Sequence, residues 1–215
     1  YLSQVNDPWT NLAIEEWLFR HTDPAAYILF MYRNDPCVVF GRNQNPWAEC
    51  NLRAMTAAGA KIVRRQSGGG AVYHDMGNTN YSVIMPRASF KWQTYAEMVA
   101  RALNQLDIPA AVNERHDITV YKRKISFSLL RGCLTSTMRD YVSGSAFKLI
   151  SQRAYHHGTM LIDTDLDGLG YFLRTDKTRL DTAGTPSVRS PVTNLRDYSY
   201  TVDHLSFCEA VHYEF

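Results

Sequence analysis

The run RRQSGGGAVYHD at residues 64–75 constrains this chain more than any other part of its sequence. Three consecutive glycines allow the backbone to approach a ligand closely, and two arginines stand just before them. Backbone N–H groups with guanidinium support can hold an anionic ligand. The run therefore predicts a nucleotide or phosphate site, while a flexible turn flanked by solvated charges stays open as the plainer interpretation.

The residues after the glycines exclude the two most common phosphate loops. A Walker loop places Lys and then Ser or Thr after its last glycine, and a dinucleotide fingerprint opens a helix with spaced glycines. Here Ala71-Val72-Tyr73 follows, and Val and Tyr favour a strand. We expect the glycine run to lead into a β-strand.

Composition places the chain among globular proteins. Its 215 residues are 45% hydrophobic and 12% aromatic, enough to bury a core in one large domain or two small ones. The formal net charge is only +2, with acids and bases interspersed. This balance predicts no general affinity for nucleic acid or for an anionic membrane.

Cysteine usage and hydropathy limit the class further. The four cysteines form no Cys-x-x-Cys pair, and a chain of this length needs no disulfide framework, so we expect a reducing compartment. No apolar run approaches about 18 residues, which predicts no membrane span. The sequence begins with Tyr1 rather than Met, so a targeting segment would not be visible in it.

The pattern of apolar residues predicts an α+β fold. Helical spacing occurs in three segments, which are residues 9–19, 50–60 and 96–106. The expected strands are residues 27–32, 37–40, 61–63, 79–85, 117–121 and 158–163. Because short strands dominate, we expect a mixed β-sheet with flanking helices.

Five further segments accompany the glycine run in an order and at a spacing shared with one family. They are NLAIEE (residues 11–16), GRNQNPW (41–47), SGSA (143–146), YHHGT (155–159) and SVRS (187–190). Together with the glycine run they resemble the lipoate–protein ligase A and mitochondrial lipoyltransferase family. The resemblance implies a catalytic domain of the biotin/lipoate protein ligase type over residues 1–215, without the C-terminal accessory domain that the family often has.

The resemblance implies an enzyme that activates lipoate with ATP as lipoyl-adenylate and passes the lipoyl group to a lysine of a lipoyl acceptor domain. Such acceptors are subunits of 2-oxoacid dehydrogenases and the glycine cleavage H protein. Attack of a carboxylate on the α-phosphate brings two anions together, so cations and N–H donors must face the developing charge. The implied contacts to ATP and lipoyl-adenylate are Arg65, Gly70, Ala71, Val72, Tyr73, Asp117 and Lys124.

The resemblance also implies features that no motif in the chain spells out. Trp47 and Val72 are expected to line an apolar slot for the acyl chain. Mg²⁺ is implied by the pyrophosphate leaving group, although the sequence has no metal-ligand motif.

His156 and His157 would point to opposite faces of a strand and make a poor chelate. We expect a monomer that resides in mitochondria, with the cytoplasm as the alternative.

The lysine motif of the family is interrupted in this chain. Members carry Lys-Ile/Val-Ser-Gly-Ser/Thr-Ala, whose lysine contacts both the carboxylate and the α-phosphate, but direct alignment puts Tyr141 at that position. A second alignment uses Lys124-Ile125 and treats the seventeen residues 126–142 as an insertion before Ser143. We expect Lys124 to be the catalytic lysine, and both a genuine insertion and a retained intron of seventeen codons stay open.

Two alternative functions follow from this interruption and from the family's diversity. One is a transferase that uses preformed lipoyl-nucleotide or a lipoyl protein as donor. The other is an inactive module that binds a nucleotide or an acceptor domain without turnover. Release of pyrophosphate from ATP and free lipoate separates the first alternative from a ligase.

Overall fold

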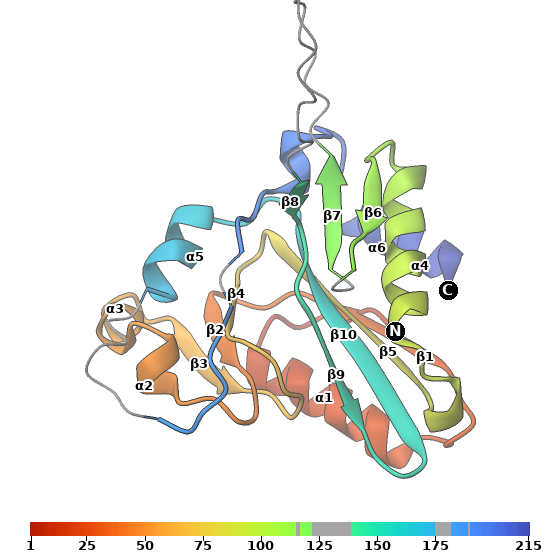
Figure 1. Ribbon diagram of the computed structural model, residues 1–215, viewed down its shortest axis with the longest axis horizontal. Helices are drawn as coiled ribbons and strands as arrows, with labels where there is room; N and C mark the ends of the chain where they lie inside the picture. Colours follow the sequence, from red (N-terminus) through yellow and green to blue (C-terminus); the bar gives the residue numbers. More distant parts are fainter. Residues whose placement is uncertain (115–116, 122–138, 175–181, 189) are drawn as a thin grey trace, which may run out of the picture.

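The computed structural model describes residues 1–114, 117–121, 139–174, 182–188 and 190–215. It has the expected α+β architecture, and Figure 1 shows helices flanking the strands. The strands are divided among three sheets of four, three and three strands. They form a large antiparallel sheet, a mixed sheet of three strands and a second antiparallel sheet of three strands.

The large sheet forms the centre of the molecule. Its order is β1 (Ile28–Tyr32), β5 (Asn78–Pro86), β10 (Arg153–Leu161) and β9 (Ser145–Leu149), and every neighbouring pair is antiparallel. Nearly every residue of β1, β5 and β10 is buried, because helices cover both faces of the sheet. α1 (Pro8–His21) packs on one face, and α4 (Trp92–Gln105) and α6 (His204–Glu214) pack on the other.

Two of these helices begin at well-formed caps. The carboxylate of Asp7 accepts a hydrogen bond from the N–H of Thr10, and Pro8 occupies the first turn of α1, where its missing N–H costs nothing. Asp203 and Ser206 form a reciprocal capping box at the start of α6. The sequence therefore specifies locally where α1 and α6 begin.

The second sheet carries the glycine run. β2 (Cys37–Phe40) pairs in parallel with β3 (Lys61–Arg64) and antiparallel with β4 (Val72–His74). The crossover between β2 and β3 contains α2 (Pro46–Glu49) and α3 (Leu52–Ala57), and α5 (Leu166–Phe172) packs on α3 and β4. The expected strand after the glycines is confirmed as β4.

The third sheet consists of β6 (Ala110–Val112), β7 (Ile118–Tyr121) and β8 (Arg139–Tyr141) in that order. Two short 3-10 helices, η1 (Arg87–Ser89) and η3 (Leu195–Asp197), complete the described elements. The last four residues of the expected insertion are part of this structure, because β8 pairs with β7 and Val142 is fully buried in the main core. Residues 126–138 and Lys124 lie outside the described residues.

Several elements differ from the sequence-based expectation. The helix expected over residues 50–60 spans only Leu52–Ala57, because Asn51 caps its start and Gly59 follows with a φ of 64°. The strand expected at residues 158–163 begins at Arg153 as β10. Sequence reasoning did not predict β9, α5 or α6, whose short or weakly patterned sequences acquire their places through tertiary packing.

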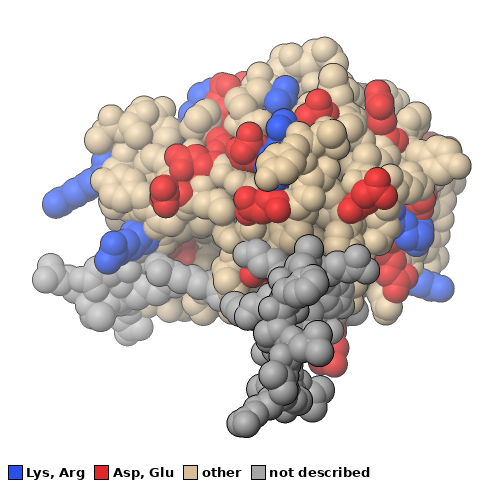
Figure 2. Space-filling model, turned by 90° about the horizontal axis from the view of Figure 1, so that it is seen from above, with Lys and Arg blue, Asp and Glu red and all other residues tan. Residues whose placement is uncertain are grey.

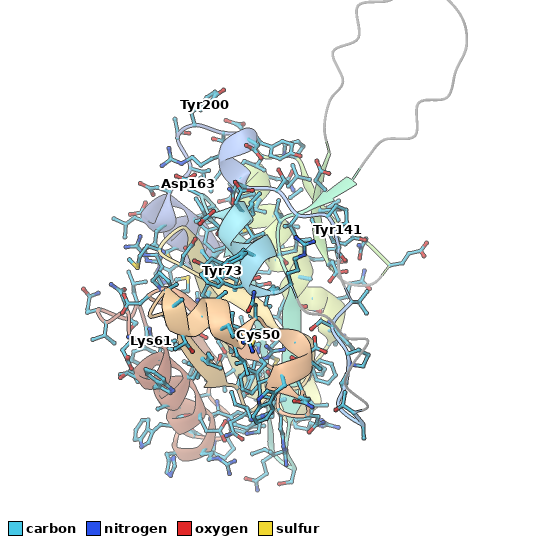
Figure 3. All side chains as sticks on the ribbon, turned by 90° about the vertical axis from the view of Figure 1, so that its left-hand side faces the viewer. Cys50, Lys61, Tyr73, Tyr141, Asp163 and Tyr200 are labelled. Atoms are coloured by element: carbon cyan, nitrogen blue, oxygen red, sulfur yellow. The ribbon has the colours of Figure 1, made fainter. Side chains whose placement is uncertain are left out.

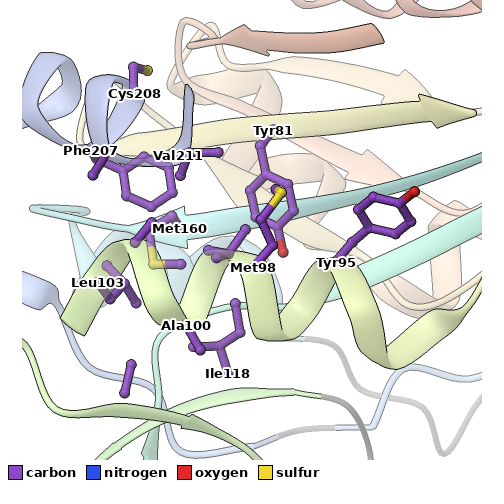
Figure 4. Packing of buried hydrophobic residues seen from close by; sticks show 14 of the residues in the cluster. Tyr81, Tyr95, Met98, Ala100, Leu103, Ile118, Met160, Phe207, Cys208 and Val211 are labelled. Atoms are coloured by element: carbon purple, nitrogen blue, oxygen red, sulfur yellow. The ribbon is translucent and has the colours of Figure 1, made fainter. Parts of the chain in front are cut away.

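The largest cluster of buried apolar residues lies between the central sheet and α4 with α6. Figure 4 shows Leu103 of α4, Phe207 of α6 and Met160 of β10 in this cluster, and all three side chains are fully buried. Among the described residues, Cys37, Cys50 and Cys208 are free and buried. No helix built from the described residues is long and apolar enough to cross a membrane.

Candidate active site

A cavity of about 530 Å³ separates the glycine loop, defined here as residues 65–71, from strands β8, β9 and β10. Figure 3 shows Tyr73 of β4 and Tyr141 of β8, and both residues line this cavity. Its apolar wall includes Leu12, Val39, Val72, Leu161, Leu169 and Val192. A cavity of this size with apolar walls and a polar loop is typical of a small-molecule site.

The glycine loop is held in place by Arg65. The Nη2 group of Arg65 donates to the carbonyl oxygens of Gly68 at 2.6 Å and Gly70 at 2.7 Å, and Nη1 donates to the carbonyl of Val39 at 3.2 Å. Gly69, between the two carbonyls, has a φ of 86°, which favours glycine. Burial lowers the pKa of Arg65 to about 10, which keeps the side chain cationic at neutral pH.

A segment distant in sequence covers part of the loop. The hydroxyl oxygen of Ser187 accepts hydrogen bonds from the Ala71 N–H at 2.9 Å and from Gln44 Nε2 at 3.0 Å. The side-chain oxygen of Gln44 in turn accepts from the Gly41 N–H at 2.9 Å. Sequence reasoning placed Gln44 and Ser187 in motifs without assigning them a role, because a contact across 143 residues leaves no local pattern.

The Tyr-His-Asp tail of the glycine run connects the loop to its surroundings. Asp75 accepts hydrogen bonds from the N–H of Gly77 and of Asp165, each at 2.8 Å, and Asp165 caps α5. His74 lies next to the amide of Asn34 at 3.0 Å, and burial lowers its pKa to about 3. Tyr73 packs on Phe172 of α5, and burial raises its pKa to about 12. The tail therefore stabilises the fold around the cavity.

The structure brings most of the predicted site residues together. The cavity lining includes Arg65, Gly70, Ala71, Val72, Tyr73 and Asp117. Lys124 lies outside the described residues, and Tyr141 lines the cavity at the end of β8, opposite Thr119 of β7. Trp47 is 66% exposed and is not part of the lining, so its expected place in the apolar slot is wrong. Val72 does line the cavity.

The described lining of the cavity carries one cationic side chain, that of Arg65, and two carboxylates, those of Glu49 and Asp117. Among the described lining residues, Arg65 carries the only guanidinium or ammonium group. Figure 2 shows acidic and basic side chains interspersed over the face in view, in keeping with the net charge of +2. Within the described part of the chain, no group of three His, Cys, Asp or Glu residues could hold a metal ion.

A pair of buried residues next to the loop is a further site feature that sequence reasoning did not predict. Glu15 of α1 and His157 of β10 are buried and lie 2.9 Å apart at Oε1 and Nδ1. The motifs NLAIEE and YHHGT contain these two residues, but their separation in sequence concealed that they meet.

Comparisons with known proteins agree with this architecture. Residues 7–215 match the family model of the lipoyl protein ligase A/B catalytic domain. A lipoate-protein ligase A from Psychrobacter cryohalolentis is 37% identical over 209 residues, which cover 97% of this chain and 57% of that protein. The chain thus spans little more than half the length of this curated relative.

Two solved structures are similar over the whole chain. The structure of P. falciparum LipL1 in complex with lipoate has 28% identity and a TM-score of 0.79, and 60% of that chain is covered. A lipoate-protein ligase A bound with ATP has 28% identity and a TM-score of 0.76, and 83% of it is covered. On this evidence the chain belongs to the lipoyl protein ligase A/B catalytic domain family.

Proposed function

We propose that the chain attaches lipoate, through lipoyl-adenylate, to a lysine of a lipoyl acceptor domain. The observation that carries this proposal is the cavity in which a glycine loop held by Arg65 faces apolar walls. Such a cavity offers N–H groups and positive charge to a phosphate, and an apolar surface to an acyl chain. The relatives solved with lipoate and with ATP support both halves of the assignment.

The proposed reaction has two steps. A carboxylate oxygen of lipoate attacks the α-phosphorus of ATP. A bond forms between this oxygen and phosphorus, and the bond from phosphorus to the pyrophosphate leaving group breaks. The acceptor lysine, as a neutral amine, then attacks the acyl carbon; an amide forms, AMP leaves, and the amine loses a proton. Arg65 and the backbone from Gly70 to Tyr73 would face the charge that develops on phosphorus.

The described lining offers Mg²⁺ carboxylate oxygens as ligands. Among the described residues, Asp117 and Glu49 are the carboxylates that line the cavity. Mg²⁺ that accompanies a nucleotide keeps several waters and uses one or two carboxylates in addition to phosphate oxygens. Each carboxylate would supply at most one such ligand, and the ion when bound would supply neutralising charge to the pyrophosphate.

The register of β8 supports Lys124 as the second cation of the site. If Ile125 were joined directly to Ser143, Lys124 and Ile125 would take the backbone positions of Tyr141 and Val142. Ile125 would then fill a fully buried apolar position, and Lys124 would line the cavity. The remaining turn between Val120 and Arg123 would have two residues, a common length in β-hairpins.

Tyr141 favours a second candidate, an inactive module that binds nucleotide or acceptor without turnover. Its phenol stands in the lining where the lysine of a direct alignment would stand, and a phenol cannot supply a positive charge. A transferase that uses preformed lipoyl-nucleotide is the third possibility. The ligase, the transferase and the inactive module are distinguished by whether the chain performs both partial reactions, only the transfer, or neither.

The experiment compares the chain as it stands with a chain that lacks residues 126–142. Each is given ATP, lipoate and a purified lipoyl domain of a 2-oxoacid dehydrogenase, and pyrophosphate release and lipoylation are measured. We expect lipoate-dependent pyrophosphate release by the shortened chain. Lipoylation only from synthetic lipoyl-adenylate identifies a transferase, and no reaction by either chain with retained ATP binding identifies an inactive module.

The native protein decides whether residues 126–142 are genuine. A tryptic peptide over residues 126–131, detected by mass spectrometry of the natural source, would exclude the retained intron. Residence in mitochondria, the monomeric state and the choice of acceptor stay predictions that fractionation, light scattering and assays with several lipoyl domains would test.

A further inference from the structure

A buried series of four hydrogen-bonded residues connects α1 to the glycine loop. It consists of Glu15 on α1, His157 on β10, and Ser67 and Arg65 in the loop, which are 2%, 8%, 1% and 6% exposed. His157 Nδ1 lies 2.9 Å from Glu15 Oε1, and His157 Nε2 lies 2.8 Å from Ser67 Oγ. Arg65 Nε donates to Ser67 Oγ at 3.0 Å. These residues are called the relay below.

The donor and acceptor capacities of the groups assign the direction of the hydrogen bonds at the two ends of the relay. A carboxylate only accepts, so His157 donates from Nδ1 to Glu15. Ser67 Oγ accepts from Arg65 Nε and forms a second hydrogen bond with His157 Nε2. Glu15 therefore keeps a proton on Nδ1 of His157 and sets the orientation of the imidazole ring that faces Ser67.

The relay ends on the groups that shape the loop. Arg65 donates to the carbonyls of Gly68 and Gly70, so the orientation of its guanidinium sets the orientation of the peptide groups between them. The relay also links a buried carboxylate to a buried guanidinium through an imidazole and a hydroxyl group. A buried charge without such a counterpart is strongly unfavourable, which makes the arrangement cooperative.

We infer that Glu15 and His157 are positioning residues that hold the glycine loop in the conformation that receives ATP, acting through Ser67 and Arg65. The inference rests on the proposed function for the identity of the ligand. The coupling between α1 and the loop is independent of what the ligand is. Both His157 and Arg65 also line the cavity, so a bound ligand lies directly against the relay.

Glu16 provides a matched control for Glu15. It is the next residue on α1, but its carboxylate pairs with Lys148 at 2.7 Å and with Arg20, outside the relay. Glu15→Met and Glu16→Met therefore remove the same group one residue apart. Glu15→Gln keeps a side-chain oxygen that can accept from His157 Nδ1–H, so it serves as the conservative variant.

The first measurement is hydrogen exchange of a peptide over residues 64–75, followed by mass spectrometry, in the full chain without ligands. We expect Glu15→Met to raise exchange in the loop roughly tenfold, the effect of losing one hydrogen bond of about 1.4 kcal/mol to a charged group. Glu15→Gln is expected to retain most of the protection. Glu16→Met should leave exchange of the loop within about twofold of the unsubstituted chain.

The second measurement is ATP affinity and turnover of whichever chain form shows pyrophosphate release. Glu15→Met is expected to raise the KM for ATP roughly tenfold with a smaller change in kcat, since loop positioning is required before chemistry. Unchanged loop exchange in a folded Glu15→Met chain would overturn the inference. So would an increase spread equally over α1, β10 and the loop, because that pattern indicates a purely structural role.

Failure of the inference is distinguishable from failure of the proposed function. Hydrogen exchange needs no turnover, so it tests the relay even in a chain that releases no pyrophosphate. If Glu15→Met does not fold, Ser67→Ala interrupts the relay at its other end with a much smaller loss of volume. Unaltered loop exchange in Ser67→Ala would then overturn the inference by itself.

Discussion

A Cβ atom on Gly41 would lie 2.2 Å from the carbonyl oxygen of Gly69. These two glycines bring the end of β2 and the glycine loop into backbone contact. The Arg42 N–H also donates to the Ser67 carbonyl at 2.8 Å, so the two segments are joined by hydrogen bonds as well as by close packing. The glycine run therefore depends on a glycine elsewhere in the chain.

Gly41→Ala is expected to destabilise the loop. The added methyl group would overlap the carbonyl oxygen of Gly69, so the backbone there would have to move. Such overpacking lowers the free energy of unfolding by about 1–3 kcal/mol. Gly68→Ala is the control, because a Cβ there meets no atom within 4 Å and its φ is not in the left-handed region. Urea unfolding measures both, and equal stability of the two variants would contradict the close contact.

Tyr141→Lys is expected to increase lipoate-dependent pyrophosphate release by the chain that retains residues 126–142. A lysine here would add an ammonium group to a lining in which Arg65 is otherwise the only described cation. One well-placed electrostatic group is worth about 10²–10³ in kcat. The exposed Tyr171→Lys adds the same charge at a residue outside the cavity lining and should leave the rate unchanged.

An unchanged rate in Tyr141→Lys would mean that the position at the end of β8 is not where the reaction needs positive charge. It would also remove the main support for Lys124 in the shortened chain. Retained ATP binding in the variant shows that the added lysine has not blocked the cavity.

Asp75→Ala is expected to lower the free energy of unfolding by about 1–3 kcal/mol, because the N–H groups of Gly77 and Asp165 lose a charged acceptor. Asp75→Asn retains one acceptor oxygen and should lose less. Asp167→Ala, an exposed change on the first turn of α5, is the matched control. A chain in which Asp75→Ala and Asp167→Ala are equally stable would refute the role of Asp75 in joining the loop to α5.

Stability is expected to fall as the pH is lowered from about 6.5 towards 4. Burial lowers the pKa of His74 to about 3, so the unfolded chain takes up a proton before the folded chain does. The contribution of His74 is complete above its unfolded pKa and declines by up to about 1.4 kcal/mol per pH unit below it. Burial also lowers the pKa of His204, to about 4, which acts in the same direction.

His74→Gln tests this origin of the pH dependence. Urea unfolding at several pH values should give a shallower slope for His74→Gln than for the unsubstituted chain. Replacement of the exposed His212 by Gln is the control for loss of a histidine at the surface. A slope that is the same in all three chains would assign the acid sensitivity to other groups.

Local sequence signals predicted a substantial part of the fold. The strand-favouring residues after the glycines form β4, and the apolar spacing of residues 96–106 lies within α4. The strands expected at residues 27–32 and 37–40 exist, but they belong to different sheets. The turn between them could be recognised from Arg33-Asn34-Asp35-Pro36, whereas the partners that each strand selects depend on segments far along the chain.

The candidate site was predicted in its parts. Arg65 and Gly70–Tyr73 were expected around a ligand, and all of them line the cavity. The sequence did not reveal that the donors of Arg65 are directed to Gly68, Gly70 and Val39, or that Ser187 bonds to the Ala71 N–H across 116 residues. A residue type indicates what a group can donate or accept, but only its neighbours in space determine which partner it finds.

The sequence by itself determined the glycine run, the strand that follows it, and the interruption between Lys124 and Ser143. These features depend on backbone preferences and on the order of residues. Only the tertiary structure decided that Glu15 and His157 form a hydrogen-bonded series with Ser67 and Arg65 of the loop, and that Tyr141 lines the cavity. Such contacts form only when burial of the apolar faces of helices and strands brings together residues that are far apart in the sequence.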